Sequence, residues 1–204
     1  LLIEIPRLME NRTMTDVQRA FEQGIRWRPA VGSGSEVLRL RLRKRRGVRA
    51  DGTVVGSDGE REFQMTYAVG CDAFWRVQGA RVRLLHAKQP DVVLRSDGRG
   101  NWADGRGTLM PQLDGCIDID ISATPFTNTL PIKRLALRPG ASAEISVAFI
   151  DVPAMTVESV RQRYTCLDHH ATGATYRFES LPCAALPDGF SADLPVDADG
   201  LVLD

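Results

Sequence analysis

The sequence predicts a mainly β protein in which one meandering antiparallel sheet curls around a short central helix. Segments with alternating apolar and polar side chains recur from Ile25 to the end of the chain, as in half-buried strands. Turns rich in Gly and Asp separate these segments, and no βαβ pattern is present. Because long twisted sheets seldom stay flat, we expect this sheet to curl and to leave a concave apolar face. Side chains or a ligand must then fill that face.

The clearest strand is Val37–Arg43, in which Leu38, Leu40 and Leu42 alternate with arginines. The same reasoning gives further strands at Ala50–Gly56, Phe63–Val69, Trp75–Gln78, Arg81–Leu85, Val92–Arg95, Gly100–Ala103, Ala143–Ile150, Thr156–Val160, Gln162–Leu167, Ala174–Ser180 and Phe190–Val196.

Six of the eight residues from Arg39 to Arg46 are basic. Such a run can form an anion-binding or membrane-surface patch, or only the solvated face of a strand and its turn. The zero net charge of the chain and the lack of interleaved aromatic residues favour the solvated face.

The central helix is expected in the segment that follows the alternating strand Ile117–Ile121. Thr124 is a good N-cap, and Pro125 suits the first helical position. We expect a helix over Phe126–Leu130, because Pro131 opposes its continuation, and then a strand over Ile132–Leu137. The polar side chains in this apolar surrounding need hydrogen-bond partners if they are buried.

The run Asp114–Leu135 (DGCIDIDISATPFTNTLPIKRL) closely resembles the signature of a bacterial family labelled "putative glycolipid-binding". The resemblance covers roughly residues 25 to 204 and includes Trp75–Arg76, Asp97–Gly98, Gly100–Trp102, Gln162–Thr165, Tyr176–Phe178 and Asp199–Val202. It implies a many-stranded spiral β-roll, or incomplete barrel, around a helix. That fold is distantly similar to bacterial lipoprotein-localisation factors, which carry acyl chains in a hydrophobic cavity.

The function that this resemblance implies is non-enzymatic binding of a glycolipid or another long-chain lipid in a cavity of the roll. Aromatic residues of the chain would line the cavity, although such residues also fill ordinary β cores. Its polar residues near the mouth would orient the head group. The candidate ligand-binding residues are Trp75, Trp102, Phe126, Thr127, Asn128, Arg134, Tyr164 and Tyr176.

Two rival functions remain open at this point. Asp118 and Asp120 lie on one strand face about 7 Å apart, a spacing that suits a hydrolase with paired carboxylates. An ion pair with Lys133, Arg134 or another base is the simpler interpretation. The third possibility is a structural or interaction domain whose roll is fully packed by its own side chains.

Length and composition limit the domain organisation and the other possible classes of function. The chain has 204 residues and no Pro/Gly/Ser-rich linker, so we expect an extension of unknown role over residues 1–24 and one domain over residues 25–204. A last strand that starts near Leu201 would be cut at Asp204, so we expect the domain to be truncated at its C-terminus. The balance of 26 basic and 26 acidic residues gives no support for nucleic-acid binding, and the sequence leaves a homodimer open. No transmembrane segment or signal peptide is visible, which favours a cytoplasmic location, although the chain starts without Met.

We expect no cofactor and no metal site. The four cysteines, Cys71, Cys116, Cys166 and Cys183, are widely spaced and are expected to be free and mostly buried. His169 and His170 are adjacent in a loop-like segment, and no further residue has the spacing of a zinc ligand. Thr15–Asp16 would cap a short helix that runs through Phe21 and ends at Gly24.

Overall fold

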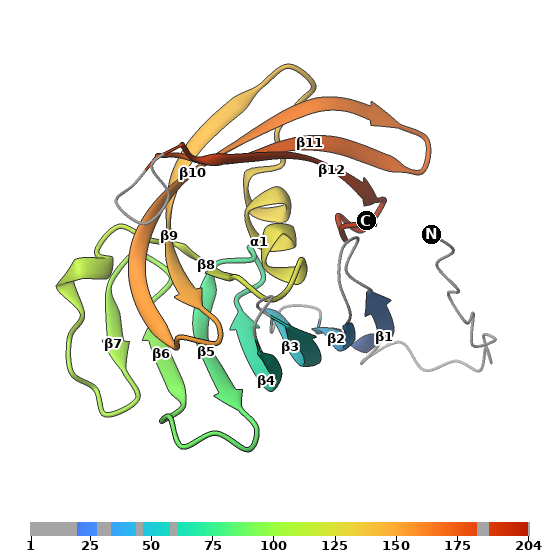
Figure 1. Cartoon of the computed structure of the whole chain (residues 1–204). Coiled ribbons are helices and arrows are strands. Elements are labelled where there is room, and N and C mark those ends of the chain that lie inside the picture. The colour runs from blue at the N-terminus through green and yellow to red at the C-terminus, as the bar shows by residue number, and fades with distance from the viewer. Residues whose placement is uncertain (1–19, 28–33, 44–46, 58–60, 183–187, 204) are drawn as a thin grey trace.

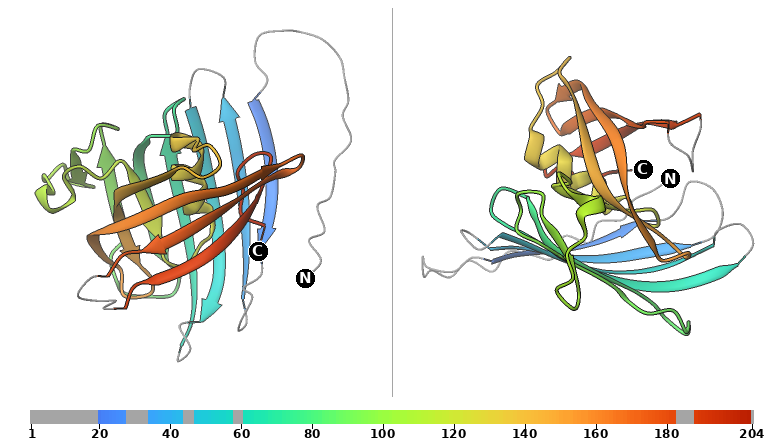
Figure 2. Two further views of the ribbon diagram at one scale, coloured as in Figure 1. Left: turned by 90° about the horizontal axis from the view of Figure 1, so that it is seen from above. Right: turned by 90° about the vertical axis from the view of Figure 1, so that its left-hand side faces the viewer.

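The computed structural model describes residues 20–27, 34–43, 47–57, 61–182 and 188–203. Two β-sheets enclose one α-helix, and Figures 1 and 2 show the helix in the space between them. The prediction of a mainly β fold that curls around a short helix is therefore confirmed. The strands are divided between two sheets, because the chain leaves the first sheet after its seventh strand.

The first sheet is an antiparallel meander in which each strand pairs with its neighbours along the chain. On β2 the buried Leu38 and Leu40 alternate with the exposed Val37 and Arg39, as the sequence predicts. The strands are β1 (Ala20–Trp27), β2 (Ser35–Arg43), β3 (Gly47–Ser57), β4 (Glu62–Cys71), β5 (Val77–Leu84), β6 (Val92–Ser96) and β7 (Trp102–Asp104).

The second sheet has the order β12-β11-β10-β9-β8, and its β8–β9 pair is parallel. A short 3-10 helix, η1 (Pro111–Leu113), precedes β8 (Asp118–Ile121), and the helix α1 (Phe126–Leu135) connects β8 to β9 (Ser142–Asp151). The remaining strands are β10 (Thr156–His170), β11 (Gly173–Ser180) and β12 (Phe190–Asp197). Because α1 makes the crossover between parallel neighbours, it lies against the sheet beside β8.

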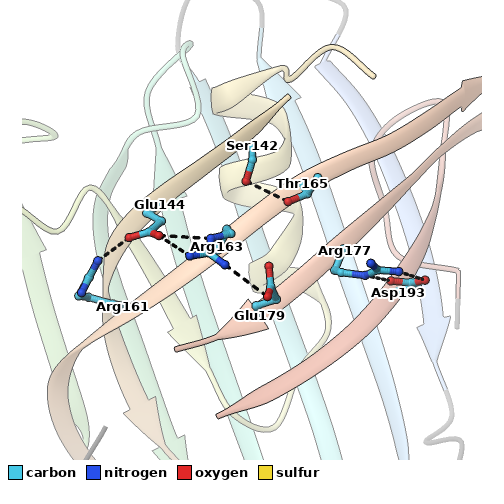
Figure 3. A network of polar contacts seen from close by, with 8 residues as sticks. All are labelled: Ser142, Glu144, Arg161, Arg163, Thr165, Arg177, Glu179 and Asp193. Atoms are coloured by element: carbon cyan, nitrogen blue, oxygen red, sulfur yellow. Dashed lines mark hydrogen bonds and ion pairs between the residues drawn. The ribbon is translucent and has the colours of Figure 1, made fainter. Parts of the chain in front are cut away.

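The outer face of the second sheet is a ladder of ion pairs between neighbouring strands (Figure 3). Glu144 on β9 binds both Arg161 and Arg163 on β10, and Arg177 on β11 binds Asp193 on β12 with Nε and Oδ1 2.8 Å apart. These exposed charges alternate along the strands with residues that face the helix. The alternation therefore fixes which residues of β10 and β11 point inwards.

The helix continues through Pro131, so the expected end at Leu130 and the expected strand Ile132–Leu137 are wrong. Pro131 and Ile132 are buried, and tertiary packing outweighs the lost amide hydrogen bond. The helix ends at Ala136, which has left-handed dihedral angles (φ 46°, ψ 49°) and donates its N–H to the carbonyl of Ile132.

The N-terminus of the helix follows the prediction. Pro125 has helical dihedral angles (φ −72°, ψ −16°), so Thr124 occupies the capping position. The Oγ1 atom of Thr124 accepts the N–H of Phe126 at 3.1 Å. Thr124 is buried, and its hydroxyl thus satisfies one of the amide groups that a helix start leaves without a partner.

Three boundaries differ from the sequence predictions. Ala20 and Phe21 lie in β1 and not in a helix, and Gly24 pairs with Arg39 inside the sheet; Thr15–Asp16 lie outside the described residues. The two segments expected around Gly79 form one strand, β5, and those around Arg161 form the single strand β10. In each case backbone pairing with a neighbouring strand continues through the residue at which the pattern breaks: Gly24 pairs with β2, Gly79 with β4 and β6, and Arg161 with β9.

The core has two clusters that meet at α1. The larger one covers the inner face of the first sheet, includes Phe126 and Leu130 of the helix, and extends to Ile119 of β8 and Ile150 of β9. The smaller one lies on the inner face of the second sheet and includes Ile132 and Tyr164. The helix thus contributes different residues to the two clusters.

Candidate functional site

A cleft of about 1040 Å³, which we call the interlayer cleft, lies between the two sheets beside the N-terminus of α1. All strands of the second sheet and β1 to β4 of the first contribute to its wall. Its bulky apolar residues are Trp27, Phe63, Phe149, Phe178, Phe190 and Leu194. Its larger polar residues are Glu36, Asp120, Thr124, Asn128 and Gln162.

Glu36 is a buried carboxyl group on the first sheet. It shares the inward face of β2 with Leu38 and Leu40, and only 3% of its surface is exposed. Its Oε1 atom accepts hydrogen bonds from Tyr67 Oη and, at 2.8 Å, from Thr124 Oγ1. Its Oε2 atom is buried and has no partner among the described residues. Glu36 therefore keeps an unused hydrogen-bonding atom in the wall of the cleft.

Gly52 makes room for the Tyr67 contact. Gly52 lies opposite Tyr67 in the β3–β4 pair, and a Cβ atom there would lie 2.1 Å from the Tyr67 ring. The ring thus crosses β3 directly over the glycine and reaches Glu36 on β2. The absence of a side chain at position 52 is what allows this contact.

Burial raises the pKa of Glu36 to about 7, although the hydrogen bonds from Tyr67 and Thr124 lower it. The pKa of Tyr67 is raised well above its usual value, first by burial and then by the Glu36 charge, so the phenol remains a donor. Glu36 therefore exchanges between its neutral and charged forms near neutral pH.

Asp120 is the second carboxyl group of the cleft and is held by α1 and β10. Its Oδ1 accepts from Thr127 Oγ1 at 2.9 Å, and its Oδ2 accepts from Gln162 Nε2 at 2.6 Å. Thr127 Oγ1 in turn accepts the N–H of Ile121 at 3.2 Å. Burial raises the pKa of Asp120, and the bonds from Gln162 and Thr127 oppose the rise. These contacts fix the carboxyl group at the wall of the cleft.

Asp118 has a different role from Asp120. It is fully buried, and Arg134 binds both its oxygens, with Nη2 2.6 Å from Oδ2 and Nε 3.1 Å from each oxygen. The interpretation of Asp118 as the partner of a nearby base is thus confirmed for Arg134. Burial raises the pKa of Asp118, and Arg134 opposes that rise. The two carboxylates therefore do not face a common open space.

Three of the eight predicted ligand-binding residues come together at the cleft. Asn128 lines it, Tyr164 Oη donates to Asn128 Oδ1 at 2.7 Å, and Thr127 binds the carboxyl group of Asp120. Tyr164 and Thr127 are almost completely buried, so they act on the cleft through the side chains they hold. Ligand contact by these residues stays a prediction.

The other five predicted residues lie elsewhere. Phe126 stacks on Tyr67 in the core, and Trp102 is buried with its Nε1 donating to the carbonyl of Cys116 at 2.7 Å. Arg134 is engaged by Asp118, as described above. The ring of Trp75 lies 5.7 Å from the Lys133 ammonium, and Tyr176 lines a second, smaller pocket of about 380 Å³.

The cysteines and the adjacent histidines of the described residues lie outside the cleft. Cys71, Cys116 and Cys166 are free and buried, as predicted, whereas Cys183 lies outside the described residues. His169 and His170 are exposed at the end of β10. Within the described part of the chain, no group of three His, Cys, Asp or Glu residues is arranged to hold a metal ion.

Sequence reasoning missed Glu36, Gln162 and the phenylalanine residues of the cleft. Strand parity carries the signal for two of them. Glu36 is in phase with the inward leucines of β2, and Gln162 is in phase with Val160 and Tyr164 on β10. A polar residue at an inward position of a strand indicates a buried network or a site.

Comparison with known proteins agrees with this architecture. The profile of the family described as "Putative glycolipid-binding" matches residues 24–204. The chain belongs to this family. A crystal structure of a DUF1089 family protein from Pseudomonas aeruginosa is similar, with a TM-score of 0.74, 35% sequence identity and 96% of each chain covered. No curated protein shows significant similarity. Neither helix in the described ranges has the length and apolar character that crossing a membrane requires.

Proposed function

We propose that this protein binds a glycolipid or another long-chain amphipathic molecule in the interlayer cleft and does not transform it. The observation that carries the proposal is the composition of the cleft wall. Aromatic side chains from both sheets and a group of polar side chains around the start of α1 face one space. A ligand with an apolar chain and a polar head matches such a wall.

The apolar part of the wall supports binding of an acyl or alkyl chain. Phe178 and Phe190 lie on neighbouring strands of the second sheet with ring centroids 6.1 Å apart, and Phe63 lies on the first sheet. Phe190 is 56% exposed, so its ring is available to a ligand. Transfer of each CH₂ group into such surroundings contributes about 0.8 kcal/mol.

The size of the cleft favours a binder over a fully packed structural domain. Ligand sites usually have volumes of roughly 300–1,000 Å³. The interlayer cleft, at about 1040 Å³, lies just above the upper limit of this range. A domain with only a structural role gains nothing from leaving such a space between its sheets.

The hydrolase alternative has less support. A pair of catalytic carboxylates must flank one scissile bond. Asp120 lines the cleft, but Asp118 is fully buried and bound by Arg134. Only one of the two carboxyl groups that the sequence suggested as a catalytic pair therefore faces the cleft.

A chain-length series tests the proposal. Purified, delipidated protein is titrated by calorimetry with octyl, decyl and dodecyl maltoside below their micelle concentrations, with maltose as the chain-free control. We expect saturable binding that tightens by about tenfold for each added pair of CH₂ groups, from the transfer free energy given above. Affinity that is independent of chain length, or no binding at all, would exclude this function.

A cleft-filling variant locates the binding. Ala192 lies on β12 in the cleft wall, so Ala192→Trp should abolish binding and leave the melting temperature nearly unchanged. The control is Thr53→Trp, because Thr53 is exposed on the outer face of β3, away from the cleft. This variant should leave binding intact. Equal binding by both variants would place the ligand outside the cleft.

A further inference from the structure

The ionisable side chains that line the cleft are all acidic among the described residues. Among the described residues that line it there is no Lys, Arg or His, whereas Glu36 and Asp120 both contribute carboxyl groups. The two nearby cations of α1 are engaged elsewhere, because Arg134 binds Asp118 and Lys133 lies against the ring of Trp75. A negatively charged head group would therefore be repelled, with no compensating cation among the described residues of the wall.

The hydrogen-bonding groups of the wall suit hydroxyl groups. The Oε2 atom of Glu36 is buried without a partner among the described residues and needs one from a ligand or water. A hydroxyl group both donates and accepts, so it can satisfy Glu36 whether or not that carboxyl group is protonated. At pH 8 a phosphate, sulfate or carboxylate head is fully ionised and has only acceptors, so it cannot hydrogen-bond to an ionised Glu36.

The acceptors are also fixed in place. Asp120 is held by Thr127 and Gln162, and Glu36 is held by Tyr67 and Thr124. The Asn128 side chain, fixed by Tyr164, adds an amide at the same end of the cleft. Preorganised polar groups of this kind lower the entropy cost of binding a polyhydroxylated group.

From these observations we propose that the interlayer cleft selects an uncharged, hydroxyl-rich head group, such as a neutral sugar, and excludes amphiphiles with phosphate, sulfate or carboxylate heads. Glu36 and Asp120 are the residues that contact the head. The inference rests on the proposed function and narrows it, because glycolipids as a class include sulfated, phosphorylated and sialylated members.

Amphiphiles with one chain length and different heads test this inference. Dodecyl maltoside, dodecanoate, dodecyl phosphate and the methyl ether of dodecyl triethylene glycol are each titrated at pH 8 below their micelle concentrations. We expect dodecyl maltoside to bind at least tenfold more tightly than the two anions. The ether is uncharged but has no hydrogen-bond donor, so its affinity should lie between that of the maltoside and those of the two anions.

The outcomes separate the two proposals. If all four probes bind with similar affinity, the cleft accepts long chains and the head-group inference is wrong. If dodecanoate or dodecyl phosphate binds more tightly than the maltoside, the inference is also wrong. If no probe binds, the proposed function fails and this inference fails with it.

Variants of the two carboxyl groups give a second test. Asp120→Asn and Glu36→Gln keep the shape of each side chain and remove its charge, so each should raise dodecanoate affinity several-fold and weaken maltoside binding. Glu144→Gln, on the outer face of β9, is the matched control and should change neither affinity. The melting temperature of each variant confirms that it is folded. An unchanged maltoside-to-dodecanoate ratio in both cleft variants would overturn the assignment.

Discussion

Glu36 combines burial, two hydrogen bonds accepted from Tyr67 and Thr124, and an oxygen without a described partner. Its folded pKa of about 7 lies above the ordinary value of 4.5, so the folded state holds a proton that the unfolded state loses above pH 4.5. Stability from this residue is therefore complete below pH 4.5 and falls as pH rises through about 7. The shift corresponds to a loss on the order of 3 kcal/mol.

We predict that Glu36→Gln removes this part of the pH dependence. The variant should gain stability relative to the wild type as pH rises from 5 to 8, because a neutral amide has no charge to bury. Urea unfolding at several pH values measures the effect. A constant difference between variant and wild type across this range would show that Glu36 titrates normally. Other buried acids such as Asp118 are common to both proteins and cancel in the comparison.

Arg134 and Asp118 form a buried ion pair whose partners are 19% and 0% exposed. We predict that Arg134→Leu destabilises the protein by roughly 3–5 kcal/mol, because Asp118 would remain buried without a compensating charge. Chemical denaturation measures this loss. Arg177→Leu is the control, since the Arg177–Asp193 pair is about half exposed, and it should cost less than about 1 kcal/mol. Similar losses in both variants would contradict the argument.

At the scale of elements, the β3–β4 pair depends on Gly52. We predict that Gly52→Ala destabilises the protein by about 1–3 kcal/mol, because the new methyl group would overlap the rigid Tyr67 ring and displace it from Glu36. Gly70→Ala on β4 is the matched control, since a Cβ atom there meets nothing within 4 Å. Its stability should be unchanged or slightly higher. Thermal unfolding of both variants distinguishes a steric effect from a general intolerance of alanine.

The elements also show how far local sequence patterns reach. Alternation placed β2 correctly, because its inward leucines and outward arginines each satisfy one face of a sheet. The expectation that proline ends a helix failed at Pro131, where the missing amide favours an end but burial of Pro131 and Ile132 favours continuation. Alternation failed within β10, because ladder hydrogen bonds to β9 and β11 depend on neighbours that the local pattern does not contain.

At the scale of the molecule, the candidate site could be predicted only in part. Asn128 and Asp120 belong to the central segment that the sequence singles out, so local reasoning found them. Phe63, Phe149 and Phe190 come from strands of both sheets and meet only because the sheets face each other. Their side chains look like ordinary core residues in the sequence, and the space between them follows from how the two layers diverge.

The two layers are joined at one end of the cleft by Trp27. Its Nε1 atom on β1 donates to the carbonyl of Val202 at 2.7 Å, and Val202 pairs with Val196 on β12. Leu201 packs in the larger core cluster and Val202 in the smaller one. This contact therefore connects β1, an edge strand of the first sheet, to the chain segment that pairs with β12, an edge strand of the second.

We predict that Trp27→Phe loosens this connection while both sheets stay folded. The variant leaves a buried carbonyl oxygen without its donor, which should cost about 1–3 kcal/mol. Hydrogen exchange followed by mass spectrometry should show faster exchange in residues 20–27 and 195–203 and unchanged protection in the central strands β5 and β6. Affinity for dodecyl maltoside should fall, because the ends of the cleft wall would no longer be held together. A uniform increase in exchange over both sheets would mean that Trp27 supports the whole fold and not the spacing of the layers.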